Sequence, residues 1–433
     1  MNMHDFVYRN GEMVCEKVSL TRVAQETGTP CYVYSFKTLV EHLQKLQRAL
    51  RELDPLICFS MKSNSNLTLC KALVDCGAGL DIVSGGELYR ALKIGTDPQK
   101  IVFAGVGKSD EEIKEALHRR ILFFNVESIP ELERINQIAA QERRRPNIAL
   151  RVNPNVESST HHYIKTGVGT SKFGLDFETA VKLFKEKRKY PSVRLVGIHV
   201  HIGSQITESR PFVQALRKTV DLIEELKRHG HWIGWLNIGG GLGIIYQRET
   251  PLTPRQFADA VVPILKGKGL RIILEPGRFI SGNAGILLTR VQYIKETPAK
   301  QFVIVDASMG DLIRPSLYGA YHKIVPVIKR ATDPSTALRA GDRRRTTAVD
   351  VVGPICESGD FLGKDRELPG LQQGDLLAVM SAGAYGFTMA SNYNSRPRPA
   401  EVMVKGNRFA VIRQRETYAD LIRGENIPPF IAR

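Results

Sequence analysis

The chain has 433 residues, of which 42% are hydrophobic and 24% charged, so it can bury a large core. No apolar run reaches the roughly 20 residues of a transmembrane helix, and the first residues lack the apolar stretch of a signal peptide. The six cysteines have no CxxC spacing, which argues against a disulfide framework and a zinc ribbon, so we expect a cytoplasmic protein with free thiols.

The net charge of +16 raises the question of whether nucleic acid is a partner. Much of the excess lies in short arginine-rich bursts near residues 144, 344 and 397. These bursts lie far apart in connectors rich in proline and polar residues, without interleaved aromatic residues. We therefore expect no nucleic-acid partner, but a solvated basic surface with a mild attraction for small anions.

The first elements, in chain order, are β-prone. The segment DFVYRNGEMVCE contains a hairpin-like RNGE turn at 9–12. We expect residues 1–32 to supply one or more strands to a β domain rather than to begin the next domain.

From residue 56 to 275, short apolar runs alternate with longer amphipathic stretches. One of these stretches, SDEEIKEALHRR, has Ser109 and Glu112 at the spacing of a capping box. The eight runs, each typical of a strand buried on both faces, are PLICFSMK, GLDIVS, IVFAG, ILFFNV, NIALRVN, LVGIHVHI, WIGWLNI and RIILEP. The pattern predicts an α/β fold, a (β/α)8 TIM-type barrel over 33–285; a doubly wound open sheet fits this strand count less well.

Beyond residue 285 the sequence becomes rich in β-prone segments separated by turns. These segments are FVIVDASM, TAVDVVGPIC, DLLAVMS and RFAVIRQ. They predict a mostly β domain over 286–433.

Chemistry in such a barrel collects at the carboxyl ends of the strands. The polar residues and glycines expected there are Lys62, Asp81, Ser84, Glu87, Asn125, Glu127, Arg151, Asn153, His199, His201, Gly239–Gly241, Glu275 and Arg278. Taken alone, Lys62 would more often be a surface lysine than a catalytic amine. The glycine run after the seventh run and EPGRF after the eighth favour a phosphate site, although three glycines can also form a tight turn.

His199 and His201 are two residues apart on a predicted strand, so both should face the barrel mouth. Together with His161 and His162 they could be metal ligands, but no third-ligand pattern accompanies them, and we expect no metal. A second interpretation is that His199 and His201 are ordinary core residues. The favoured interpretation is that they contact a flat cofactor. A lysine, a phosphate loop, a ring partner and a buried carboxylate together suggest pyridoxal 5′-phosphate (PLP).

The sequence then resembles a known family over essentially its whole length. The motifs that carry the resemblance, in family order, are FSMKSN, GAGLDIVSGGEL, FAGVGKSDEEI, FNVES, RVNP, THHYIKTGVGTSKFG, HVHIGSQ, NIGGGLG, EPGR, LIRPSLYGAYH, GPICESGD and GAYGFTMASNYNSRPRP. They are similar to those of diaminopimelate decarboxylases, fold-type III PLP enzymes related to ornithine and arginine decarboxylases and to alanine racemase. The family architecture is a PLP-binding barrel with a C-terminal β domain, in a homodimer that shares its active sites.

The resemblance implies a role for each matching residue around the cofactor. Lys62 would bind the cofactor aldehyde, His201 would stack on its ring with His199 beside it, and Glu275 would pair with the pyridine nitrogen. The full set of cofactor-binding residues would be Lys62, Asp81, His201, Ser204, Gly240, Gly241, Glu275, Pro276, Gly277, Arg278 and Tyr385, with Glu87 and Arg151 as supports. The family's usual lysine segment is closer to YAVKAN, but the lysine and asparagine are kept.

The resemblance also implies the reaction. The substrate would be held by Arg278, Arg314, Tyr318, Glu357 and Tyr385, and Cys356 would donate a proton into the partner subunit's site. A free thiol, with a pKa of about 8.5, is largely protonated at neutral pH and can still donate. Alanine racemases place an arginine at the pyridine nitrogen, so Glu275 favours a decarboxylase. We expect a lyase that converts meso-2,6-diaminopimelate to L-lysine and CO2, the last step of lysine biosynthesis; an ornithine or arginine decarboxylase is the alternative.

Overall fold

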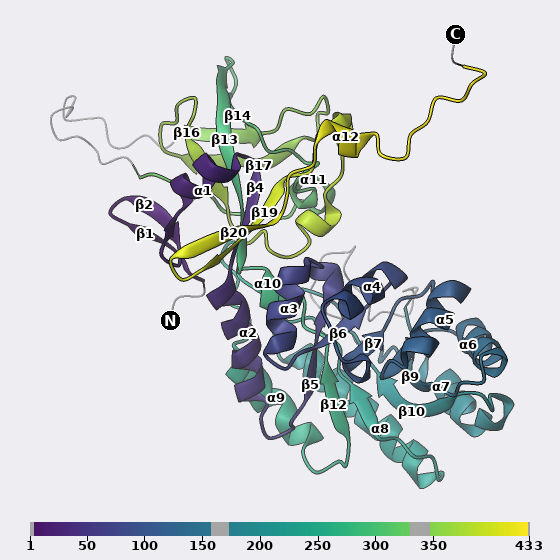
Figure 1. Ribbon diagram of the computed structural model, residues 1–433. Helices are drawn as coiled ribbons and strands as arrows, with labels where there is room; N and C mark the ends of the chain where they lie inside the picture. Colours follow the sequence, from purple (N-terminus) through teal and green to yellow (C-terminus); the bar gives the residue numbers. More distant parts are fainter. Residues whose placement is uncertain (1–3, 157–172, 330–346, 432–433) are drawn as a thin grey trace. The chain divides into compact units, whose positions relative to one another are not determined.

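The computed structural model describes residues 4–156, 173–329 and 347–431. The chain divides into two compact units, Leu39–Gly282 and Met1–Thr38 with Asn283–Arg433 (Figure 1). The strand β4 (Cys31–Ser35) crosses the boundary that the sequence suggested at residue 32, and it lies in the sheet of the second of these units.

Eight parallel strands close into a barrel, which confirms the predicted (β/α)8 architecture and excludes the open sheet. They coincide with the eight apolar runs: β5 (Leu56–Ser60), β6 (Gly79–Ile82), β7 (Ile101–Phe103), β8 (Phe123–Val126), β9 (Asn147–Arg151), β10 (Arg194–His199), β11 (Trp235–Asn237) and β12 (Arg271–Leu274). Every residue of β6, β7 and β8 is buried, because helices cover the outer face and side chains fill the interior.

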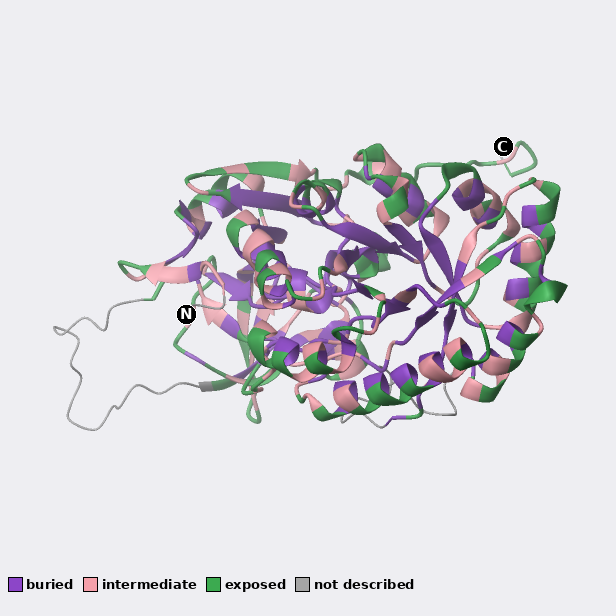
Figure 2. Ribbon diagram, turned by 90° about the horizontal axis from the view of Figure 1, so that it is seen from below, coloured by how far each residue is buried: buried purple, intermediate pink, exposed green. Residues whose placement is uncertain are grey.

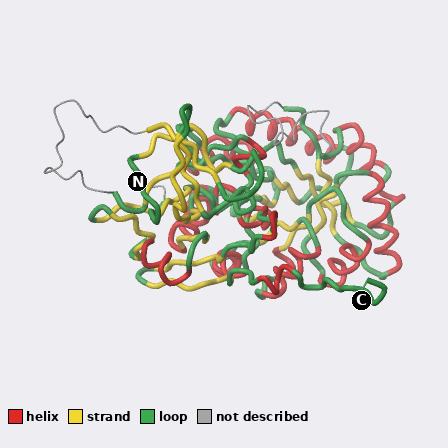
Figure 3. Tube along the Cα trace, turned by 90° about the horizontal axis from the view of Figure 1, so that it is seen from above, coloured by secondary structure: helices red, strands yellow, loops and turns green. Residues whose placement is uncertain are grey.

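Helices surround the barrel strands, as Figure 3 shows in red around yellow. They are α2 (Phe36–Ala49), α3 (Leu67–Asp75), α4 (Gly85–Lys93), α5 (Asp110–Arg119), α6 (Ile129–Gln141), α7 (Phe177–Lys185), α8 (Arg210–Arg228), α9 (Pro254–Leu265) and the short α10 (Arg278–Ser281). Each long helix buries one stripe and exposes the other, so buried and exposed residues alternate along it (Figure 2). The predicted capping box of Ser109 and Glu112 is confirmed at the start of α5. No helix of the described residues is long and apolar enough to span a membrane.

The other unit is built on a nine-stranded sheet, which confirms the predicted β domain. Its strand order is β17-β16-β14-β13-β4-β19-β20, with β18 on β13 and β15 on β18. The strands are β13 (Gly285–Glu296), β14 (Gln301–Val305), β15 (Ile324–Pro326), β16 (Thr347–Val352), β17 (Phe361–Leu368), β18 (Leu376–Val379), β19 (Ala400–Lys405) and β20 (Arg408–Arg413), together with β4. The helices α1 (Leu20–Thr27), α11 (Arg314–Tyr318) and α12 (Tyr418–Leu421) belong to the same unit.

The first strands form a small sheet of their own. The hairpin of β1 (Phe6–Arg9) and β2 (Glu12–Cys15) turns at Asn10 and Gly11, whose φ angles of 48° and 81° suit a two-residue hairpin turn. This turn confirms the one predicted from RNGE. The third strand, β3 (Val18–Ser19), completes the sheet.

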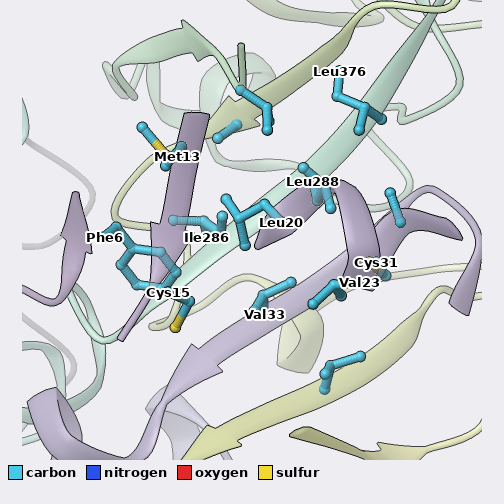
Figure 4. Packing of buried hydrophobic residues seen from close by; sticks show 14 of the residues in the cluster. Phe6, Met13, Cys15, Leu20, Val23, Cys31, Val33, Ile286, Leu288 and Leu376 are labelled. Carbon is cyan, nitrogen blue, oxygen red and sulfur yellow. The ribbon is translucent and has the colours of Figure 1, made fainter. Parts of the chain in front are cut away.

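One apolar cluster joins these pieces within the unit. Figure 4 shows Phe6 and Met13 of the small sheet, Leu20 of α1, and Val33 and Ile286 of β4 and β13 in a common core. These side chains are at most 3% exposed. The N-terminal segment is therefore held to the nine-stranded sheet by apolar burial.

Candidate active site

Lys62 lies directly after β5, in the turn Met61–Ser63, at the carboxyl end of the barrel. Its side chain is 40% exposed, and its Nζ lies 3.7 Å from Oδ2 of Asp81, at the end of β6. The fully buried Asp81 also accepts a hydrogen bond from Ser60 Oγ at 2.6 Å. Lys62 thus presents an amine to the barrel mouth beside a buried carboxylate.

The pKa of Asp81 is raised by burial and by the negative charge of Glu275, whereas the positive charge of Lys62 acts in the opposite direction. The positive charge of Lys62 therefore offsets only part of this rise, and the pKa of Asp81 stays raised, at about 8.

Glu275, which follows β12, is a buried carboxylate surrounded by donors. Its Oε1 accepts hydrogen bonds from Asn237 Nδ2 at 2.5 Å and Asn125 Nδ2 at 2.9 Å. Its Oε2 lies 3.2 Å from His199 Nε2. Burial alone would raise the pKa of Glu275, but His199, Lys62 and the bond from Asn237 outweigh burial and bring this pKa below its ordinary value. Glu275 is therefore a carboxylate, not a carboxylic acid.

His201 follows β10 and contacts the glycine run. Its Nδ1 accepts the N–H of Gly240 at 3.1 Å, so the proton of the neutral ring is on Nε2. Burial lowers the pKa of His201 well below its ordinary value, and the positive charges of Lys62 and Arg151 lower it further. The structure thus places a flat, uncharged ring beside the glycine run.

The glycines of this region are required by close backbone packing. A Cβ on Gly240 would lie 2.2 Å from the carbonyl oxygen of Glu275, and one on Gly239 would lie 2.4 Å from that of Val200. A Cβ on Gly277 would lie 3.0 Å from the side chain of Ser63. The loops after β5, β10, β11 and β12 are therefore packed against one another, which brings together the residues that they carry.

Arg278 is buried, and its guanidinium is bound within the barrel unit. Nε and one terminal nitrogen donate to Ser204 Oγ at 3.3 and 3.0 Å, and the other terminal nitrogen donates to Tyr246 Oη at 2.6 Å. Ser204 and Arg278 were both predicted to bind the cofactor, and they lie together. Tyr246 was not predicted, because nothing in its local sequence marks it.

Two further predicted supports make contacts at the barrel mouth. Arg151 donates to Glu127 Oε2 at 2.8 Å, and both are buried. Glu87 accepts the backbone N–H of Val83 at 2.8 Å, and burial raises the pKa of Glu87 to about 7.

Sequence reasoning gave no role to Asn125 or Asn237, the two donors to Glu275. The available signal was their position: each lies on a barrel strand near its carboxyl end, and each is fully buried in an otherwise apolar strand. A buried amide needs hydrogen-bond partners, so an asparagine there indicates a polar neighbour.

The remaining predicted substrate residues lie in the β unit. Arg314, at the start of α11, is 7% exposed, and its guanidinium carbon lies 5.8 Å from the ring centre of Tyr318 and 6.0 Å from that of Tyr385. Tyr385 has a φ of 56°, which is unusual for a side chain of this size. The structure therefore brings Arg314, Tyr318 and Tyr385 together within this unit.

His322 orients Arg314, a role that the sequence did not reveal. The Nε of Arg314 donates to His322 Nε2 at 3.3 Å, so that ring nitrogen carries no proton. The proton is on Nδ1, which donates to the carbonyl oxygen of Met380 at 2.9 Å.

Cys356 and Glu357 lie exposed on the loop 353–360. The buried Asp360 holds this loop by accepting the N–H groups of Met309 at 2.6 Å and Ile355 at 2.7 Å. The N–H of Cys356 donates to Asn394 Oδ1 at 2.9 Å. The loop therefore has a defined conformation that presents the thiol to solvent in the single chain.

The side chains at the barrel mouth have the chemical groups that bind PLP. Lys62 offers an amine to an aldehyde, Glu275 offers an anionic partner to a pyridinium nitrogen, and Ser204 with Arg278 offers donors to a phosphate. Asp81 Oδ1 and Asn125 Oδ1 are buried without a hydrogen-bond partner among the described residues, as in a site built around a polar molecule. Among the same residues, no three His, Cys, Asp or Glu side chains gather as metal ligands; His161 and His162 lie outside the described residues.

Known proteins similar to this chain are pyridoxal-dependent enzymes, in agreement with the side chains at the barrel mouth. Residues 36–282 match the family described as pyridoxal-dependent decarboxylase, pyridoxal binding domain. A diaminopimelate decarboxylase of Aquifex aeolicus is 49% identical, covering 95% of this chain and 95% of that relative, and one of Vibrio cholerae is 46% identical, covering 97% and 98%.

A solved structure extends the comparison to the fold. The diaminopimelate decarboxylase from M. jannaschii in co-complex with L-lysine is 38% identical, with a TM-score of 0.91 over 100% of both chains. The family match covers more than half of the chain, and the relatives cover nearly all of it. The chain belongs to the diaminopimelate decarboxylase family of pyridoxal-dependent decarboxylases.

Proposed function

We propose that this protein removes one carboxylate from meso-diaminopimelate to give L-lysine and CO2, with PLP as cofactor, at the end of lysine biosynthesis. The observation that carries the proposal is the buried Glu275, which two asparagine amides and the charges of His199 and Lys62 keep as a carboxylate. The close relatives are diaminopimelate decarboxylases, and L-lysine is the ligand of the M. jannaschii structure.

The barrel residues bind and orient the cofactor. Lys62 would anchor its aldehyde, Glu275 would hold a proton at its pyridine nitrogen, and the neutral ring of His201 would contact its ring. The N–H of Gly241, with Ser204 and the loop 275–278, would hold the phosphate, while the N–H of Gly240 donates to His201. When bound, PLP supplies an electron sink for the electron pair of the breaking C–C bond.

Substrate recognition depends on charged groups at the end of the substrate that does not react. Arg314, flanked by Tyr318 and Tyr385, is suited to bind the second carboxylate of diaminopimelate. A diamino acid with a single carboxylate lacks this group. Glu357 matches the distal ammonium. A substrate without the second carboxylate would offer no charge-assisted hydrogen bond to the Arg314 guanidinium, which is the proposed basis of discrimination.

The reaction ends with a proton delivered to the carbon that has lost its carboxylate. We assign this proton to the thiol of Cys356, from the β unit of a partner subunit in a homodimer. Cys356 and Glu357 are exposed in the single chain, so they are accessible to the site of a partner subunit. All six cysteines are free thiols, which supports a cytoplasmic location.

The test is release of CO2 by the purified protein with PLP, measured separately with meso-diaminopimelate, L-ornithine and L-arginine. We expect kcat/KM for meso-diaminopimelate to exceed the other two by at least about a hundredfold. The Lys62→Ala variant, as control, should lose CO2 release together with the visible absorbance of the anchored cofactor. Equal or faster release from ornithine or arginine would overturn the proposed substrate.

A further inference from the structure

A polar pocket lies at the amino ends of the barrel strands, opposite the end that carries Lys62 and Glu275. It has a volume of about 280 Å³ and is lined by residues near the starts of β8, β9 and β10. Asn147 and Arg194 are the first residues of β9 and β10, and the apolar Phe124 of β8 also lines the pocket. None of the residues predicted to bind the cofactor lines this pocket.

Four arginines line the pocket, and its lining contains no carboxylate. They are Arg120, Arg144, Arg145 and Arg194. None of the four forms an ion pair with a described carboxylate. The two acidic side chains nearest in sequence are paired elsewhere, Glu115 with Arg119 at 2.7 Å and Glu142 with His118 at 2.9 Å.

The orientation of one guanidinium is set by its neighbour. Arg194 Nε donates to Asn147 Oδ1 at 3.0 Å, and the Nδ2 of Asn147 donates to the carbonyl oxygen of Leu122 at 3.1 Å. The use of Nε leaves the terminal nitrogens of Arg194 without a hydrogen-bond partner among the described residues. Four positive groups around one small pocket repel one another unless an anion enters, so the pocket is electrostatically suited to a multiply charged anion.

We propose that this pocket binds an anion with two linked phosphate groups, such as pyrophosphate or the diphosphate of a nucleotide. A guanidinium matches phosphate oxygens with two parallel N–H bonds, which a lysine cannot do. Four guanidiniums provide donors for more than one phosphate group, and the volume exceeds what a single phosphate fills. The proposed binding site is independent of the proposed decarboxylation. Two arginines of the basic segment at 143–145 would bind the anion.

The test is calorimetric titration of the holoenzyme with sodium pyrophosphate, ADP and inorganic phosphate in magnesium-free buffer. Bound PLP keeps the cofactor's own phosphate site filled. We expect pyrophosphate or ADP to bind at least about tenfold more tightly than inorganic phosphate, because more arginines are engaged. Tighter binding of ADP would assign the site to nucleotides, and tighter binding of pyrophosphate would assign it to the inorganic ion.

A pair of double variants separates the pocket from the general positive charge of the surface. Arg144→Gln/Arg145→Gln should weaken binding at least about tenfold. Arg143→Gln/Arg188→Gln removes the same charge from arginines that do not line the pocket, and it should change affinity by less than about twofold.

Equal weakening by both double variants, or absence of binding to the unmodified holoenzyme at millimolar ligand, would overturn the proposal. If the first double variant does not fold, the single Arg145→Gln variant, whose side chain is exposed, gives the same comparison against Arg143→Gln.

Discussion

Glu275 shows how the barrel keeps a buried carboxylate charged. Two asparagine amides donate to one of its oxygens, and His199 contacts the other. A carboxylate in an apolar interior would otherwise take up a proton. Asn125, Asn237 and His199 are therefore positioning residues for Glu275, and its charge is the property on which its proposed role at the cofactor's pyridine nitrogen depends.

The first prediction at the residue scale concerns that charge. Glu275→Gln keeps the size of the side chain and removes its charge, so kcat with meso-diaminopimelate should fall about 10²–10³-fold, the range typical of losing one electrostatic contact in a buried site. The visible absorbance of the Lys62-anchored cofactor should remain, since the amine is untouched.

A matched control is Glu127→Gln, which alters another buried carboxylate of the barrel mouth, the one paired with Arg151. Its kcat should fall much less than that of Glu275→Gln. Comparable losses in the two variants would show that Glu275 serves packing rather than the cofactor.

At the residue scale, the candidate residues could be predicted where the chemistry belongs to the side chain itself. Lys62 and Glu275 are of this kind, whereas the role of Cys356 was implied by the family resemblance; the roles of all three stay predictions. The partners that tune them could not: Asn237 and Asn125 lie 38 and 150 residues from Glu275 in sequence. Tyr246 and His322 were missed for the same reason, because a hydrogen-bond partner is defined by the fold and not by spacing.

At the scale of elements, the strand-end loops of the barrel act as one packed layer. The glycines after β11 permit backbone contacts with the loops after β10 and β12 that no side chain could fit. Gly240 has the closest such contact, since a Cβ at this position would lie 2.2 Å from the carbonyl oxygen of Glu275. The N–H of Gly240 donates to His201, so a shift of this loop would move that contact together with the proposed phosphate donors.

The second prediction follows from this packing. Gly240→Ala should weaken PLP binding at least about tenfold, because the loop must move away from the positions at which its N–H groups meet the phosphate. The measurement is the dissociation constant of PLP, titrated into the apoprotein by absorbance.

Gly107→Ala is the control, since a Cβ there meets no atom within 4 Å. Its PLP affinity should match that of the unmodified protein. An unchanged affinity of Gly240→Ala would mean that the glycine run only forms a turn and does not hold the phosphate.

The elements themselves were accessible to sequence reasoning. Short runs buried on both faces identify strands of a parallel barrel, and the spacing of Ser109 and Glu112 identifies a helix start, because both patterns depend on neighbours along the chain. The separate sheet formed by β1, β2 and β3 was not predicted, since strand pairing depends on distant partners.

At the scale of the whole molecule, the residues proposed for catalysis and substrate binding are divided between two units of the chain. Lys62 and Glu275 belong to the barrel, whereas Arg314, Tyr385 and Cys356 belong to the β unit. The proposed homodimer would complete each barrel site with Cys356 of the partner, so the two residues could be supplied by different chains.

The third prediction tests this shared site. Lys62→Ala and Cys356→Ala are each expected to be nearly inactive, but a mixture that exchanges subunits should recover up to about a quarter of the unmodified activity. In a twofold-symmetric dimer, half of the mixed molecules are heterodimers, and each of these has one intact site. CO2 release is measured after dissociation and reassembly of the mixed chains.

The control is reassembly of each variant alone, which should remain inactive. A mixture that never exceeds its parents, although heterodimers are present, would show that Cys356 serves the site of its own chain.

The succession of barrel strands along the chain, the barrel and the β domain could be read from the amino-acid sequence, which also gave candidate reactive residues whose roles stay predictions. Periodicity and side-chain chemistry are local properties, so a linear chain records them directly. The ionised state of Glu275, the neutral ring of His201, the contact of Arg278 with Tyr246 and the arginine pocket at 120–194 were decided only by the tertiary structure. These features arise from burial and from contacts between residues far apart in sequence, which exist only once the chain has folded.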